Sequence, residues 1–257
     1  MAFDFKKEYK EFYLPKRTPE LVSVPPMTFV AVRGEGDPNV EGGAYKEAVG
    51  VLYAIAYTIK MSKMGDHRID GYYDFVVPPL EGFWWQPGVE GVDFANKATF
   101  HWIAAIRLPD FVTPEEFSWA KEEAARKKGL DTTAAELLTI EEGLCAQIMH
   151  LGPYDDEPAT VALLDAFIAE QGLENDMSDT EAGRHHHAPH RAREAEDGSA
   201  ASGAAARLAR KLHLHVHDAA VIELVGGAHE TELLVKALGV GLGLDSDDVG
   251  VQFLLGH

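Results

Sequence analysis

The sequence has little that would tie the chain to an oxidising compartment or to a membrane. Cys145 is the only cysteine among 257 residues, so no intramolecular disulfide can form, and its apolar neighbours predict an inert buried thiol in a reducing cytosol. The longest apolar run, from Val49 to Tyr57, is less than half of the ~20 residues that cross a bilayer. Acidic and basic side chains occupy the amino terminus where a signal peptide is continuously apolar. We therefore expect a cytoplasmic protein with no membrane partner.

Basic residues are scarce as well. The chain has 23 Lys and Arg against 42 Asp and Glu, which gives a formal net charge of −19. A surface of this sign repels phosphate backbones and anionic lipids, so we expect no nucleic-acid partner. Apolar residues make up 46% of the chain, which is enough to build the core of a folded domain.

Several motifs of known chemistry are missing. The sequence has no Gly-x-Ser-x-Gly, His-Glu-x-x-His or Cys-x-x-Cys, and Gly34–Gly36 lacks the third glycine and the Lys-Ser/Thr of a phosphate loop. Asp155–Glu157 is typical of a first helical turn rather than of a metal site. His213, His215 and His217 would line one face of a strand as zinc ligands could, but we do not interpret these histidines as a metal site. We predict no metal and no cofactor.

The chain nearly repeats itself, because two segments share the order of strand, Gly/Pro turn and amphipathic helix. The copies are Thr28–Arg33, Gly34–Pro38 and a helix through Ile59, and then Cys145–His150, Gly152–Tyr154 and a helix through Ile168. Apolar spacing of three and four residues places each helix on a sheet. The predicted fold class is α+β, with two pseudo-symmetric βαββ halves, an antiparallel sheet, helices on one face and a ligand cleft at the seam between the halves.

Further elements follow from local signals. Residues 1–26 have the composition of a polar lead-in, closed by Pro25 and Pro26. Thr113 and Pro114 are an N-cap and a first-turn proline, and Gly129 ends the helix that they begin. Strand patterns cover Gly71–Val77, Glu81–Trp85 and Lys97–Leu108, and Leu137–Thr139 with Leu144–Leu151 has the pattern of a hairpin.

Aromatic residues concentrate in one stretch, where they predict a binding cleft. The predicted ligand-binding residues are Tyr72, Phe83, Trp84, Trp85, Phe100 and Trp102, with Tyr154 added from the second turn. The adjacent Trp84 and Trp85 cannot face the same side of a strand. Glu81, three residues before Trp84, is the predicted counter-charge or general acid/base. Aromatic walls with one carboxylate suit flat, hydrophobic and often cationic molecules. The alternative is that the rings form the core and that Glu81 is a solvated turn residue.

Four segments carry a family pattern, namely Lys7–Pro15, Phe29–Asn39, Tyr72–Trp85 and Gly143–Tyr154. They resemble the gyrase-inhibitor-like (GyrI-like) small-molecule-binding family, which shares its fold with the effector-binding domains of multidrug-responsive transcription regulators. The resemblance implies an aromatic cleft between two βαββ halves. It also implies either a binder of hydrophobic compounds or a hydrolase that opens the cyclopropane of DNA-alkylating natural products, in which pocket acids activate water.

The chain departs from the family after His187. Similar members continue with Glu-Ile-Tyr-Leu-Ser-Asp-Pro, a last strand whose glutamate would face the pocket, whereas His187 is followed here by Ala188 and Pro189. Codons for residues 188–203, read one base later, can spell a sequence that resembles the usual carboxyl terminus of the family. We predict a GyrI-like domain over residues 1–187 and a divergent, poorly ordered, shifted-frame tail over residues 188–257. A genuine unrelated extension is the alternative.

The sequence therefore supports three functions. The first is binding and sequestration of planar hydrophobic compounds, which the missing last-strand acid favours over turnover because a proton relay contributes ~10²–10⁴-fold to a rate. The second is the cyclopropane hydrolase, with Glu81 as the acid/base and Trp84, Trp85 and Trp102 as a stacking clamp. The third is a protein-interaction module directed at gyrase or at a regulator.

Overall fold

The computed structural model describes residues 2–89, 93, 95–151, 157–176, 207–209, 212–217 and 250–256. Its helices are α1 Phe5–Glu8, α2 Lys10–Tyr13, α3 Ala44–Met61, α4 Pro114–Lys128 and α5 Glu157–Glu170, with 3₁₀ turns at Ser62–Met64 and Lys97–Thr99. Its strands are β1 Phe3–Asp4, β2 Glu20–Val24, β3 Met27–Glu35, β4 Phe75–Val76, β5 Leu80–Trp85, β6 His101–Arg107, β7 Glu136–Ile140, β8 Gly143–Leu151, β9 Glu174–Asp176, β10 Arg207–Ala209, β11 Leu212–His217 and β12 Gly250–Gly256.

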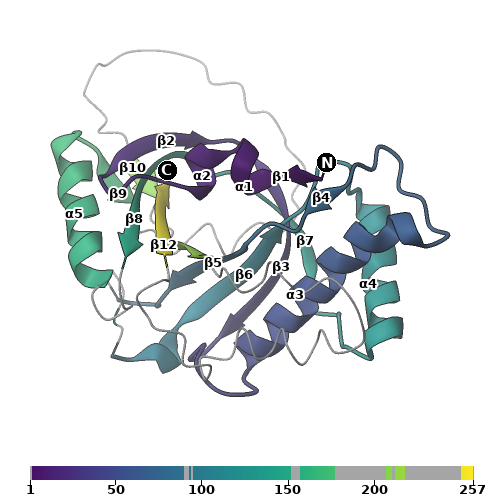
Figure 1. Ribbon diagram of the computed structural model, residues 1–257. Coiled ribbons are helices and arrows are strands. Elements are labelled where there is room, and N and C mark those ends of the chain that lie inside the picture. Colours follow the sequence, from purple (N-terminus) through teal and green to yellow (C-terminus); the bar gives the residue numbers. More distant parts are fainter. Residues whose placement is uncertain are drawn as a thin grey trace, which may run out of the picture.

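One eight-stranded sheet organises the molecule (Figure 1). Its strand order is β2-β8-β12-β11-β5-β6-β3-β7, and its pairings are antiparallel. Two small parallel pairs, β1 with β4 and β9 with β10, lie outside it. The predicted α+β class with an antiparallel sheet is confirmed.

The sheet must curve back on itself. Only Pro25 and Pro26 separate β2 from β3, and only Glu141 and Glu142 separate β7 from β8, yet these strands belong to opposite ends of the strand order. Because two residues span no more than about 10 Å, the two ends of the sheet have to approach each other. The predicted hairpin of Leu137–Thr139 with Leu144–Leu151 is therefore wrong, since β7 pairs with β3 and β8 pairs with β2 and β12.

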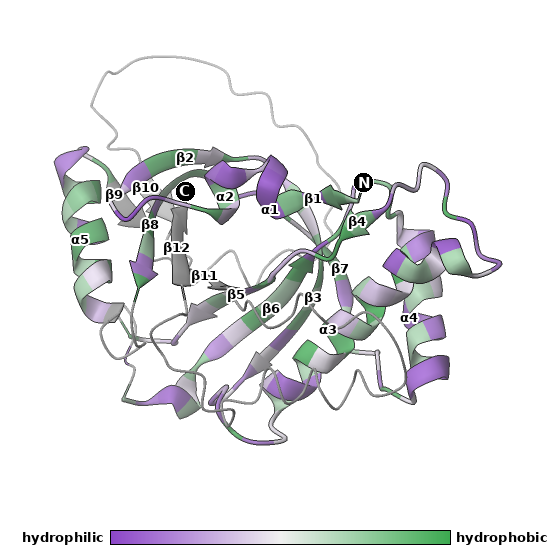
Figure 2. Cartoon of the chain, in the orientation of Figure 1, coloured by the Kyte–Doolittle hydropathy of each residue, from purple (hydrophilic) through white to green (hydrophobic). Residues whose placement is uncertain are grey.

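The register assigns each side chain of β5 to one of two faces. Trp84 lies opposite Trp102 of β6, and both indoles contact the ring of Tyr45 on α3, at centroid distances of 5.0 Å. His150 of β8 hydrogen-bonds Thr160 of α5 at 2.7 Å, and the register across β12 and β11 places it on the same face as Trp84. We call this side the helix face, because α3 and α5 both cover it. Hydrophobic residues are frequent along β3 and β6, the strands that α3 contacts (Figure 2).

The other side of the sheet is the open face, so named because neither α3 nor α5 covers it. Side chains alternate along a strand, so Glu81, Phe83 and Trp85 lie on the open face. The amino-terminal helices α1 and α2 contact this side. The side chain of Gln147, which the same register places there, donates a 2.8 Å hydrogen bond to the carbonyl of Glu11 in α2.

Two glycines make room for the tryptophans of the helix face. A β-carbon at Gly34 would lie 2.3 Å from the Trp102 ring, and one at Gly82 would lie 2.4 Å from the indole nitrogen of Trp84. Real side chains do not approach so closely, so any larger residue would have to displace an indole. Gly34, which the sequence already excluded from a phosphate loop, thus has a packing role.

Several predicted boundaries hold and others do not. Thr113 accepts a hydrogen bond from the Glu116 amide and Gly129 ends α4 in the left-handed conformation, as the caps predicted. The strand predicted over Gly71–Val77 is limited to β4, because Tyr72 and its neighbours form a turn. The strand predicted over Lys97–Leu108 begins only at His101, after a 3₁₀ turn.

Three strands, β10 to β12, lie in the segment that we predicted to be a shifted-frame tail. In the sheet β11 and β12 stand between β5 and β8. The shifted frame itself stays a prediction. Within the described part of the chain, no helix is long and apolar enough to cross a membrane.

Replacing Gly34 with alanine should destabilise the protein, because the new methyl group meets the Trp102 ring. We expect the free energy of unfolding to fall by about 1–3 kcal/mol, the usual cost of overpacking. Gly50→Ala is the matched control: the site is helical and has open space around it, so stability should rise by roughly 0.5–1 kcal/mol. Urea unfolding of both variants measures these changes, and equal effects would contradict the packing role of Gly34.

Ending the chain at His187 should impair folding, because β5 and β8 would lose their partners β11 and β12. Unpaired strand edges associate with other chains. We expect the truncated protein to elute as oligomers or aggregates in size-exclusion chromatography, at concentrations where the full chain does not. A truncated monomer with a cooperative thermal transition would show instead that the fold does not need the tail, in agreement with the shifted-frame prediction.

Candidate functional site

A buried carboxylate lies at the centre of the open face. Glu81 of β5 has only 2% of its surface exposed, and the Tyr13 hydroxyl donates a hydrogen bond of 3.4 Å to its Oε1 atom. Burial, and then the neighbouring Glu81 charge, raises the pKa of Tyr13 well above its usual value. Tyr13 therefore stays protonated and can keep donating to Glu81. The alternative that Glu81 is a solvated turn residue is wrong, because the residue lies buried inside a strand.

Arg107, the last residue of β6, completes the group. Its guanidinium charge acts on Tyr13 and opposes the rise in the pKa of Tyr13. Only 7% of the residue is exposed, and its Cζ atom lies 4.9 Å from the ring centre of Phe5 and 4.8 Å from that of Tyr9. Arg107, Tyr13 and Glu81 thus form one group, in which a neutral phenol interacts with a cation and donates a hydrogen bond to a carboxylate.

The amino-terminal segment supplies part of this site, so its interpretation as a polar lead-in is wrong. Phe5, Phe12 and Tyr13 are buried, and Tyr9 stacks on Phe12 with ring centres 6.1 Å apart. The signal that could have revealed this role was visible in the sequence, because residues 3–13 contain five aromatic rings. The polar residues between these rings occupy the outer sides of two four-residue helices.

The tryptophans do not form a single clamp. Trp84, Phe100 and Trp102 gather under α3, where Trp84 and Phe100 have ring centres 5.8 Å apart and all three rings are buried. Phe83 and Trp85 lie on the open face with Glu81. Phe83 is buried against Phe29, whereas Trp85 is half-buried and packs on His101 with ring centres 5.7 Å apart. The predicted clamp, in which Trp84, Trp85 and Trp102 stack on one ligand, therefore needs correction, because the two-residue period of β5 separates Trp85 from the others.

The remaining predicted residues lie elsewhere. Tyr72 packs on Phe111 with ring centres 5.2 Å apart, and its hydroxyl donates a 2.6 Å hydrogen bond to the carbonyl of Lys60. Burial and the nearby Asp74 raise the pKa of Tyr72 to about 12. Tyr154 lies outside the described residues. In that described part of the chain, no three His, Cys, Asp or Glu side chains are arranged to hold a metal ion.

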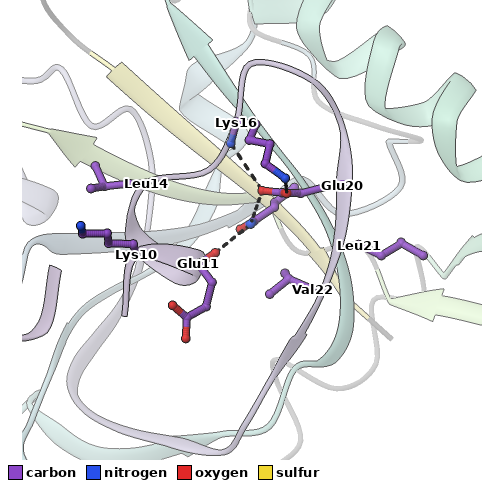
Figure 3. Close-up of a pocket in the computed structure, with 8 residues that line it drawn as sticks. Lys10, Glu11, Leu14, Lys16, Glu20, Leu21 and Val22 are labelled. Carbon is purple, nitrogen blue, oxygen red and sulfur yellow. Dashed lines mark hydrogen bonds and ion pairs between the residues drawn. The ribbon is translucent and has the colours of Figure 1, made fainter. Parts of the chain in front are cut away.

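A small pocket lies beside α2 (Figure 3). It measures about 260 Å³ and is lined by Lys10, Glu11, Leu14, Lys16, Glu20, Leu21, Val22 and Gln147. Lys16 forms an ion pair of 2.8 Å with Glu20, which also accepts a hydrogen bond from Gln147. Its lining is aliphatic and charged, so this pocket is not the aromatic cleft that the sequence predicted.

Comparison with known proteins decides the family. The GyrI-like small-molecule-binding domain family matches residues 17–182. The chain belongs to this family. No curated protein matches the sequence.

Solved structures of similar proteins match nearly the whole chain. A hydrolase from Listeria innocua is 38% identical with a TM-score of 0.74, and the match covers 100% of this chain and 99% of that one. An uncharacterised conserved protein from the same organism is 39% identical with a TM-score of 0.71, over 99% and 98% of the two chains. A second hydrolase structure from that organism is 38% identical with a TM-score of 0.70, over 99% of both chains.

Replacing Tyr72 with phenylalanine should change alkaline stability. Its folded pKa of about 12 exceeds the ordinary value near 10, so the hydroxyl contributes stability in full below pH ~10 and loses it as the pH rises through about 12. We expect wild-type protein to be more stable than Tyr72→Phe at pH 8 and the difference to shrink above pH ~10. Urea midpoints across this range measure it, and a difference independent of pH would refute the raised pKa.

Proposed function

We propose that this GyrI-like chain is a hydrolase that binds a planar hydrophobic small molecule against the open face and uses Glu81 to activate water. The observation that carries the proposal is a buried carboxylate, hydrogen-bonded by a protonated tyrosine, in a chain that is 38% identical to a named hydrolase. Turnover ranks below simple binding on the sequence alone, and the relatives favour the reverse order. Sequestration without turnover remains the second candidate, supported by the family description.

Aromatic surface near Glu81 supports binding of a flat molecule. Trp85 is half-buried on the same face as Glu81, and Phe83 lies between them in the strand alternation. Phe5 and Tyr9 add rings beside Arg107. Stacking on such rings is favourable for any planar apolar ligand and contributes ~0.5–1.5 kcal/mol for each pair beyond burial.

The reaction that we propose is the addition of water across one bond of a cyclopropane. Glu81 accepts a proton from water as the water oxygen bonds to one ring carbon. The adjacent C–C bond breaks, and its electron pair passes to the rest of the ligand, which then takes up a proton. Tyr13 holds the Glu81 carboxylate in place through its hydrogen bond.

The similar strand–helix order of β3–α3 and β8–α5 supports a further proposal, that the two halves are pseudo-symmetric.

Tryptophan fluorescence tests the binding step. A planar hydrophobic ligand should quench the emission of Trp85, because this indole is partly exposed on the same face as Glu81. We expect Trp85→Phe to lose the quenching and Trp84→Phe, on the helix face, to retain it. Quenching that depends on Trp84 would place the ligand under α3. No quenching by any ligand would favour a protein-interaction module instead.

Glu81→Gln tests the chemical step. The amide still accepts the Tyr13 hydrogen bond but cannot take a proton, so hydrolysis should fall by roughly 10²–10⁴-fold while ligand affinity changes little. Ring opening of a synthetic spirocyclopropyl cyclohexadienone, followed by absorbance, provides the assay. Glu35→Gln is the control, because Glu35 on β3 has 80% of its side chain exposed. Unchanged turnover in Glu81→Gln would remove Glu81 from the mechanism.

A further inference from the structure

Arg107 is a buried cation whose donors are only partly used. Within the described part of the chain, its Nε and Nη1 atoms are buried and have no hydrogen-bond partner. No described carboxylate forms an ion pair with it. Arginine is almost never buried without a partner, because removing its charge from water is expensive.

The surroundings of Arg107 favour an occupant of stated chemistry. Phe5 and Tyr9 hold the guanidinium through their ring faces, which leaves the hydrogen-bonding edge to be satisfied in another way. Arg107 also interacts with Tyr13, which donates a hydrogen bond to Glu81. An oxygen acceptor on a ligand would meet two N–H groups here while the rest of a flat molecule lies toward Glu81.

We propose that Arg107 binds an acceptor oxygen of the ligand, so that the site selects planar hydrophobic compounds that carry a carbonyl or carboxylate group. The inference rests on the proposed function, because it places a specificity-determining residue at the same site. It also revises the expectation of a cationic ligand, since a cation near Arg107 would be repelled.

The position of Arg107 also indicates where the electron pair of the broken C–C bond goes in the proposed reaction. When water adds to a cyclopropane conjugated to a carbonyl group, the electron pair of the broken C–C bond moves onto the carbonyl oxygen, which then takes up a proton. Two N–H donors on that oxygen bind the developing negative charge more tightly than the neutral carbonyl. Glu81 would accept the proton from water, and Arg107 would stabilise the oxyanion.

Matched neutral probes test the selectivity. We would measure the binding of 2-acetylnaphthalene and 2-ethylnaphthalene to the full chain by Trp85 quenching, because the probes have closely similar shapes and differ in one oxygen. A hydrogen bond from a charged donor should make the ketone bind roughly 10- to 100-fold more tightly. In Arg107→Met this ratio should fall to near one, and Arg107→Lys, which keeps the charge but not the fork, should give an intermediate ratio.

The ratio of the affinities for the two probes separates the outcomes. Loss of packing in Arg107→Met weakens both probes equally, so only the ratio reports on the acceptor subsite. If wild-type protein binds both probes with equal affinity, the acceptor subsite is refuted and the proposed function stands. If neither probe binds or quenches, the proposed function fails and this inference fails with it. A ratio that is high in wild type and unchanged in Arg107→Met would assign the oxygen to another donor.

Discussion

The alternation of side chains along β5 is the constraint on which the site depends. Its register with β6 is fixed over six residue pairs, and a shift by one residue would exchange the two faces. Gly34 and Gly82 hold this register on the helix face, because each leaves the space that an indole fills. Because Trp84 and Trp102 pack under α3, the alternation of side chains places Glu81 on the open face. Packing on one side of the sheet thus positions the chemistry on the other.

Burial of charge explains the arrangement around Glu81. A carboxylate and a guanidinium in a protein interior usually form a direct pair. Here no such pair forms among the described residues, and Tyr13 interacts with both charges, donating a hydrogen bond to Glu81 and responding to the charge of Arg107. A direct bidentate pair would use the donors of Arg107, whereas here its Nε and Nη1 atoms have no partner among the described residues.

Much of the fold could be predicted from the sequence where local signals decide it. The helix after Thr113 has a cap, a first-turn proline and a terminal glycine, and β5 and α3 have clear periodicity. Strand pairing was not predictable in the same way. The two-residue connection between β7 and β8 suggested a hairpin, but curvature of the whole sheet brings its ends together, and curvature depends on all eight strands.

The candidate site was predictable only in part. Glu81 stood out because a carboxylate preceded clustered aromatics, and the adjacency of Trp84 and Trp85 required two faces. Arg107 gave no such signal, since a single arginine at the end of an apolar strand is ordinary. Tyr13 was hidden in a segment whose average composition is polar, although its aromatic residues recur.

The amino-terminal segment links two distant strands of the sheet at the site. The Gln147 side chain of β8 donates a hydrogen bond to the Glu11 carbonyl of α2, and Tyr13 in the same short helix donates one to Glu81 of β5. Because β8 and β5 are separated by two strands in the sheet, α2 bridges positions that the sheet itself keeps apart. A four-residue helix has little stability of its own, so these contacts determine where it lies. Geometry at Glu81 is therefore coupled to β8, and changes at the small pocket beside α2 should reach the carboxylate through Tyr13.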